Sequence, residues 1–150
     1  MKYSALLLTC LLGFVACNET PSTKDKKVEN CARAFAEAYF NYDFLAAKEL
    51  VTPESEKWVR FVASSITEED VAQLNSMEQG AQAEVQDITL VDDSTSIAVV
   101  EVKEFLQKDS IGKAATIVDN AQFELVVVKR EKKYYVRMEG LPRSERQSRD

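Results

Sequence analysis

Histidine is absent from this chain of 150 residues, and glycine occurs only four times. Without histidine, neither a Ser-His-Asp nor a Cys-His catalytic arrangement can form, and a histidine-ligated metal site is excluded. The pair Gly112-Lys113 lacks the earlier glycine and the following serine or threonine of a phosphate-binding loop. A net charge of −6 disfavours nucleic acid as a partner. The sequence therefore predicts no cofactor and no metal site.

The residues that are present fit one ordinary globular domain, since 45% are hydrophobic and 29% are charged. We expect residues 28–141 to form this domain. The preceding segment, residues 17–27, has no large apolar residue beyond its cysteine and reads as a flexible tether. The last segment, residues 142–150, is a polar tail that we expect to be frayed.

Residues 1–16 are predicted to be a lipoprotein signal peptide. Lys2 supplies a positive start, and the apolar stretch over residues 5–15 is shorter than the roughly 20 residues of a spanning helix. The run from Phe14 to Cys17 (FVAC) resembles a bacterial lipobox, although leucine is usual where Phe14 stands. Two or more acyl chains on Cys17 would anchor the protein firmly. We expect a location in the cell envelope, with the periplasmic side favoured over the surface.

Cysteine usage agrees with this interpretation. Cys10 would leave with the signal peptide and Cys17 would carry the lipid, so Cys31 alone remains and no internal disulfide can form. Cys31 lies among apolar residues at helical spacing, which predicts a half-buried, unreactive thiol.

Helices are predicted in the first half of the domain. Apolar residues recur there at helical spacing, at Val28, Ala32, Phe35, Tyr39 and Tyr42. Asp43 is placed to cap a second, short helix, and Thr52-Pro53 to begin a third. Thr67 opens a fourth helix, which Gly80 ends.

After Gly80 the apolar period changes from that of a helix to two, the period of a strand. The alternation slips by one residue at Asp87, which predicts a β-bulge. Further strands are expected over residues 95–106, 116–129 and 134–138. In the strand over residues 95–106, the alternation places Phe105 and Val102 on opposite faces of the sheet. Helices followed by antiparallel strands predict an α+β domain, with helices packed on a sheet of about four strands.

Two segments carry a resemblance to a known family: ARAFAEAYFNYDFLAAKELVTPES and FELVVVKREKKYYVRMEG. Their order and spacing resemble the NTF2-like superfamily, and more narrowly the small NTF2-like lipoproteins of Bacteroidetes (the DUF4878-type domain). The resemblance implies a cone, in which a strongly curved sheet wraps the long first helix and the open end often holds a small apolar ligand. A cystatin-like helix on a sheet is the alternative fold, but it leaves the additional helices unexplained.

The candidate site residues follow from this cone. Aromatic side chains expected to line its mouth are Tyr39, Tyr42, Trp58, Phe61, Phe105 and Tyr135. Enzymes on similar cones, of the ketosteroid-isomerase and polyketide-cyclase types, use a buried carboxylate beside a tyrosine or aspartate hydrogen-bond donor. The carboxylates that could serve here are Asp87, Glu101 and Glu104. These alternate along strands where solvent can equally reach them, so no catalytic residue is assigned.

The sequence therefore favours a non-catalytic accessory module, held at a membrane through its lipid, that binds a small apolar ligand or an envelope protein. An isomerase- or cyclase-type enzyme and a structural partner of an envelope complex stay open as alternatives.

The lipobox yields a first prediction. Cys17→Ser removes the thiol to which lipid would be attached, so the variant should remain unprocessed or become soluble. Fractionation into detergent and aqueous phases, with mass spectrometry of the N-terminus, measures both outcomes. Normal processing of the variant together with complete partition into the membrane fraction would show that lipidation is wrong.

Overall fold

The computed structural model describes residues 22–147 and 149, and the predicted signal peptide and Cys17 lie outside these residues. Within the described part the chain forms four α-helices, one 3-10 helix and four strands. Their bounds are α1 Thr23–Phe40, α2 Phe44–Glu49, η1 Pro53–Ser55, α3 Glu56–Ser65, α4 Glu68–Ser76, β1 Gln82–Leu90, β2 Thr95–Gln107, β3 Thr116–Arg130 and β4 Lys133–Arg137. No helix in this part is long and apolar enough to cross a membrane.

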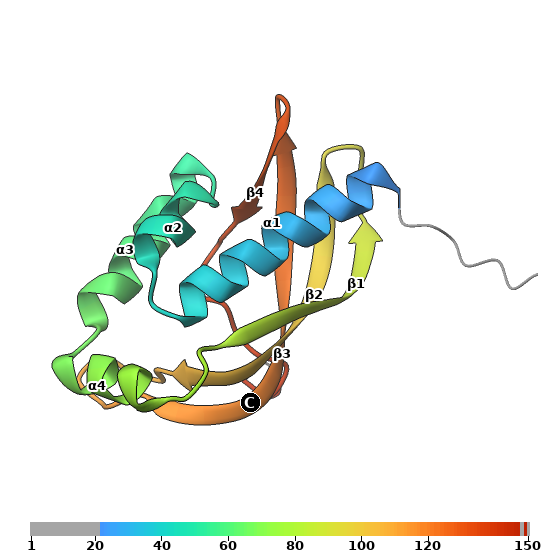
Figure 1. Cartoon of the computed structure of the whole chain (residues 1–150). Coiled ribbons are helices and arrows are strands. Elements are labelled where there is room, and N and C mark those ends of the chain that lie inside the picture. Colours follow the sequence, from blue (N-terminus) through green and yellow to red (C-terminus); the bar gives the residue numbers. More distant parts are fainter. Residues whose placement is uncertain (1–21, 148, 150) are drawn as a thin grey trace, which may run out of the picture.

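The strands form one antiparallel sheet in the order β1-β2-β3-β4, and α1 lies across one face of it (Figure 1). Helices α2 and α3 lie beside the second half of α1, and α4 lies at the bent ends of β2 and β3. The apolar stripe of α1 is buried against the sheet, with Phe35 and Ala36 fully inaccessible to solvent. This arrangement confirms the predicted helices packed on a curved sheet.

Helix α1 begins earlier than the sequence analysis placed it. It starts at Thr23, with Ser22 as its N-cap, so residues 23–27 belong to the helix and the predicted tether over them is wrong. The reason is a capping box: the Ser22 hydroxyl accepts from the Asp25 N–H, and the Asp25 carboxylate accepts from the Ser22 N–H. These bonds satisfy helix N–H groups without any apolar residue.

The polar tail is also ordered where it is described, which corrects the expected fraying of residues 142–150. Strand β4 is short and leaves part of the β3 edge unpaired, and the tail pairs there through a bridge between Phe123 and Ser144. The Glu145 N–H donates to the Gln122 carbonyl at 3.0 Å. Backbone groups at an open sheet edge need such partners.

Two irregularities curve the sheet. The pairing of β1 with β2 shifts between Val85 and Asp87, which confirms the predicted bulge. The second lies at Glu104, whose φ of 50° is in the left-handed region. Pairing keeps its register across this point, from Lys103–Asn120 to Phe105–Val118. Both strands therefore bend together there (Figure 1).

The bend corrects the position predicted for Phe105. Because the backbone turns at Glu104, Phe105 points to the same face as Val102, three residues earlier, and both are buried in the core. Strict alternation would have placed Phe105 on the opposite face.

The bend also yields a stability prediction. Glycine adopts positive φ freely, so Glu104→Gly relieves strain of about 1 kcal/mol and should leave the free energy of unfolding unchanged or raised. The matched control is Lys103→Gly, in the extended strand one residue earlier, which should lower it by about 1 kcal/mol. Urea denaturation measures both variants. Equal destabilisation by the two glycines would contradict a strained bend at Glu104.

Candidate functional site

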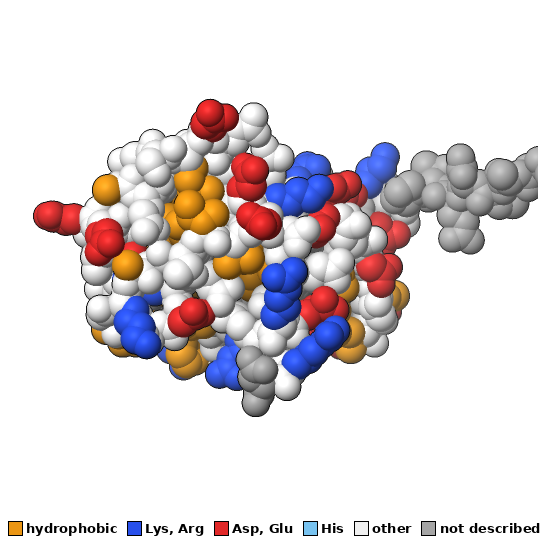
Figure 2. All heavy atoms as spheres, turned by 90° about the horizontal axis from the view of Figure 1, so that it is seen from below, with side chains coloured by type: hydrophobic (Ala, Val, Ile, Leu, Met, Phe, Trp, Pro, Cys, Tyr) orange, Lys and Arg blue, Asp and Glu red, His pale blue; other side chains and the backbone are white. Residues whose placement is uncertain are grey.

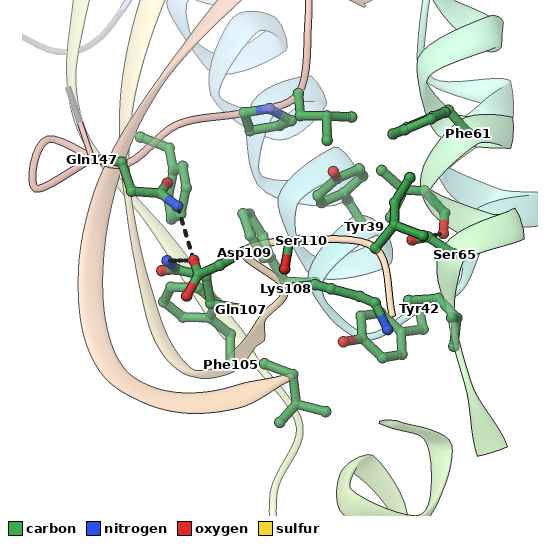
Figure 3. A pocket seen from close by; sticks show the side chains of 18 residues that line it. Tyr39, Tyr42, Phe61, Ser65, Phe105, Gln107, Lys108, Asp109, Ser110 and Gln147 are labelled. Atoms are coloured by element: carbon green, nitrogen blue, oxygen red, sulfur yellow. Dashed lines mark hydrogen bonds between the residues drawn. The ribbon is translucent and has the colours of Figure 1, made fainter. Parts of the chain in front are cut away.

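A cavity of about 270 Å³ opens at the C-terminal end of α1. Its wall is formed by the end of α1 and the residues after it, by α3, by the end of β2 with the following loop, and by the C-terminal tail (Figure 3). The aromatic side chains that line it are Tyr39, Phe40, Tyr42, Phe61, Phe105 and Phe123. The bend in β2 is what brings Phe105 into this group.

A cluster of aromatic rings forms the inner surface of the cavity. The ring centroids of Phe40 and Phe123 lie 4.7 Å apart, and Phe105 lies 5.0 Å from Phe40 and 5.5 Å from Phe123. Tyr39 contacts Phe40 edge-on at 5.1 Å. Such edge-on and tilted pairs are favourable beyond the area they bury. The result is a rigid apolar floor.

Four of the six predicted pocket residues come together here: Tyr39, Tyr42, Phe61 and Phe105. The other two lie elsewhere. Trp58 lines a separate depression beside β4, where the Lys57 ammonium lies 5.2 Å from the centre of its ring. Tyr135 lines a groove between α1, α2 and the β3–β4 turn. Neither side chain reaches the cavity.

Tyr42 combines two unfavourable features at this site. Its φ is 60°, in the left-handed region, and its hydroxyl is buried without a hydrogen-bond partner among the described residues. Burial, followed by the negative charge of Asp70, raises the pKa of Tyr42 to about 12. Local strain of this kind gathers at binding and catalytic sites.

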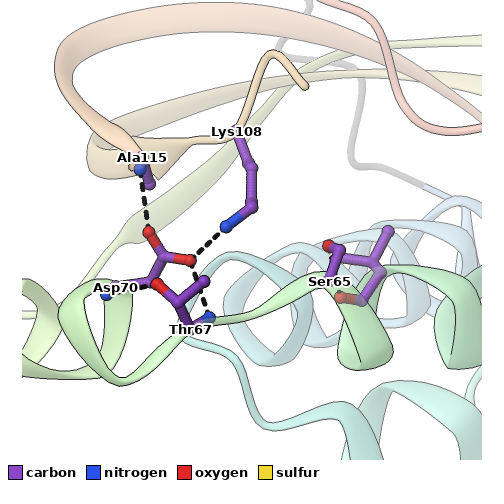
Figure 4. A network of polar contacts seen from close by, with 6 residues as sticks. Ser65, Thr67, Asp70, Lys108 and Ala115 are labelled. Carbon is purple, nitrogen blue, oxygen red and sulfur yellow. Dashed lines mark hydrogen bonds and ion pairs between the residues drawn. The ribbon is translucent and has the colours of Figure 1, made fainter. Parts of the chain in front are cut away.

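One wall of the cavity depends on the buried carboxylate of Asp70, at the start of α4 (Figure 4). It pairs with the Lys108 ammonium and accepts from the Ala115 N–H at 2.8 Å and the Thr67 N–H at 2.9 Å. Lys108 and Ala115 stand at the two ends of the β2–β3 connection. A single side chain thus fixes both ends of the loop at the cavity mouth.

The pairing also sets the protonation of Asp70. Burial alone would raise its pKa, but the hydrogen bonds from Lys108, Ala115 and Thr67 outweigh burial and hold the pKa well below its usual range. The capping box with Thr67 places Asp70 in the first turn of the helix that the sequence predicted to open at Thr67, while the pair with Lys108 is a contact that local sequence did not reveal.

The carboxylates considered for catalysis lie outside the cavity. Asp87 and Glu104 are exposed on their strands. Glu101 is half-buried, 3.8 Å from the Lys103 ammonium and within 3.5 Å of the Gln86 amide. None of the three is among the residues that line the cavity. Cys31 is buried in the core, and burial raises the pKa of its thiol to about 11.

Sequence reasoning missed most of the polar rim. The rim residues are Ser65, Gln107, Lys108, Asp109, Ser110 and Gln147. Gln147 belongs to the tail that was expected to fray, and residues 108–110 lie between two predicted strands and were assigned no role. One signal was available, since the loop after β2 follows closely on Phe105, a predicted pocket residue near the end of that strand.

The fold is similar to that of solved NTF2-like structures. A ketosteroid isomerase-like protein from Erwinia carotovora atroseptica matches 77% of this chain and 93% of its own, with a TM-score of 0.54 and 12% identity. An NTF-2 like protein of unknown function from Shewanella oneidensis MR-1 matches 79% of this chain and 96% of its own, with a TM-score of 0.51 and 9% identity. No protein-family model and no curated protein matches the chain. The described residues therefore have the NTF2-like α+β fold that the sequence predicted.

Asp70 yields a stability prediction. Asp70→Asn leaves the Lys108 ammonium, in a side chain only 9% exposed, without its counter-charge, and should lower the free energy of unfolding by about 3 kcal/mol. The native pKa of Asp70 is lowered, so its contribution is complete above about pH 4 and is lost as the pH falls further. Urea denaturation near neutral pH and in acid measures both effects.

The double variant Asp70→Asn/Lys108→Met, which removes both charges, is the control and should recover part of the loss. Parallel acid destabilisation of the wild type and Asp70→Asn would contradict the assignment to this carboxylate.

Proposed function

We propose that the protein is a non-catalytic binding module that holds a small apolar ligand in the cavity at the end of α1. The aromatic cavity itself carries this proposal. Its lining is apolar with a few polar groups at the rim, which is the usual composition of a small-molecule site. Its volume of about 270 Å³ is near the lower limit of such sites and suits a compact ligand.

The enzyme alternative, of isomerase or cyclase type, draws on the name of the ketosteroid isomerase-like neighbour. It requires a carboxylate able to take up a proton inside the cavity. Asp70 is poorly suited, because its hydrogen bonds hold its pKa far below the range of a general base. Asp87, Glu101 and Glu104 are turned elsewhere, which leaves Asp109 at the rim. Binding without catalysis is the simpler use of these residues.

The third possibility is a structural partner in an envelope complex. Such a protein would be expected to present a broad apolar surface to the complex. On the face drawn in Figure 2, apolar side chains form small separate groups between charges of both signs. This face therefore gives less support to a large docked protein than the cavity gives to a small ligand.

The proposed location rests on sequence. The lipobox at Cys17 and the resemblance to small NTF2-like lipoproteins support a lipid-anchored protein of a bacterial envelope, on the periplasmic side. Held at a membrane, the module would be concentrated near its neighbours and would act as an accessory to them.

Two neighbouring serines allow a matched test of the cavity. Ser65 lines it and Ser64 is exposed, yet each hydroxyl makes the same 2.7 Å bond to the carbonyl three residues earlier. Ser65→Phe fills the cavity and should abolish binding, whereas Ser64→Phe should bind like the wild type. Native mass spectrometry of protein purified from its own envelope detects a bound molecule, and calorimetry with phenylbutanol measures an added one.

Binding of phenylbutanol by the wild type and by Ser64→Phe, with loss in Ser65→Phe, supports the cavity. Equal binding by the two variants, or no bound molecule and no binding of phenylbutanol by the wild type, would overturn the proposed function.

A further inference from the structure

The charges at the cavity distinguish between classes of ligand. Two consecutive residues, Lys108 and Asp109, are the charged groups among the described residues that line it. Their situations differ. The Lys108 ammonium pairs with the buried Asp70, and its side chain is only 9% exposed. Its positive charge is therefore compensated within the fold by Asp70.

Asp109 keeps its negative charge uncompensated. It is exposed in the loop after β2 and accepts from the Gln107 amide at 2.5 Å and from the Gln147 amide at 3.4 Å (Figure 3). Both donors are neutral, and the ion pairs among the described residues do not include Asp109. The two amides hold the carboxylate in place at the mouth without cancelling its charge.

The rest of the lining suits a positive group as well. Aromatic ring faces attract organic cations, and Tyr39, Phe61 and Phe105 all line the cavity. The chain as a whole carries a net charge of −6, which raises the local concentration of cations at its surface. An anionic ligand of the same shape would meet the Asp109 carboxylate, and the described lining residues offer it no cation other than the paired Lys108.

We propose that the ligand is a small amphiphilic amine, with its apolar body against the aromatic floor and its ammonium at the Asp109 carboxylate. The proposal rests on the proposed function and adds the charge of the ligand to it. It sets the cavity apart from a fatty-acid site, for which Lys108 would have to be free.

Three probes of one skeleton test the charge. Phenylbutylamine, phenylbutanol and phenylbutyrate share a ring and chain and differ in their end group. An exposed carboxylate changes the affinity of a charged partner by about threefold. The amine should therefore bind about threefold more tightly than the alcohol, and the alcohol about threefold more tightly than the carboxylate. Calorimetry on the full folded protein, in one buffer of low ionic strength, measures all three.

Asp109→Asn identifies the group responsible, because it keeps the shape of the side chain and removes its charge. In this variant the amine and the carboxylate should bind with affinities close to that of the alcohol. The matched control is Asp93→Asn, which removes the same charge from the exposed β1–β2 turn at the other end of the domain (Figure 1). The control should keep the order of the wild type.

The outcomes separate the two proposals. If phenylbutanol binds in the cavity but phenylbutyrate binds as tightly as the amine or more tightly, the amine proposal is wrong and the proposed function stands. The same conclusion follows if Asp109→Asn and Asp93→Asn shift the affinities equally, since the effect would then be one of net charge alone. If none of the three probes binds, the proposed function fails together with the amine.

Discussion

The carboxylate of Asp70 joins three segments that are distant in sequence: the start of α4, the end of β2 and the start of β3. A buried charge is unfavourable unless it is paired and hydrogen-bonded, and Asp70 meets this condition through Lys108, Ala115 and Thr67. Because the partners stand at both ends of the β2–β3 connection, the loop at the cavity mouth has fixed ends. The cavity depends on this bond network, since α4 offers few other contacts to hold the bent end of the sheet in place.

The pair has a second effect on the site. By taking up the charge of Lys108, Asp70 leaves Asp109 as the charge that the proposed ligand would meet. A structural ion pair thus determines the electrostatic character of a neighbouring surface. The same arrangement explains why the short sequence Lys108-Asp109, neutral when read as a dipeptide, presents a negative site once folded.

Much of the fold was accessible to sequence reasoning because its signals are local. The slip in alternation at Asp87 and the helix start at Thr52-Pro53 each lie within a few residues and were placed correctly, although the Thr52 side chain does not cap the helix. The bend at Glu104 was not, because glutamate gives no sign of a left-handed backbone and the bend depends on the paired strand. The site residues, too, could be predicted only where the signal is local. Helical spacing identified buried aromatic residues, but it did not tell Tyr39, near the cavity, from Trp58, which faces another part of the surface.

The direction of α1 affects how a ligand would enter and leave the cavity. The helix has 18 residues, so its first turn lies roughly 27 Å from the end that contributes Tyr39 and Phe40 to the cavity. A chain attached to a bilayer ahead of Ser22 would hold the domain by the end opposite the cavity. With the proposed lipid anchor, the cavity would then lie at the end of the domain farther from the attachment point, and the proposed ligand would be nearer to solution than to the lipid that anchors the protein.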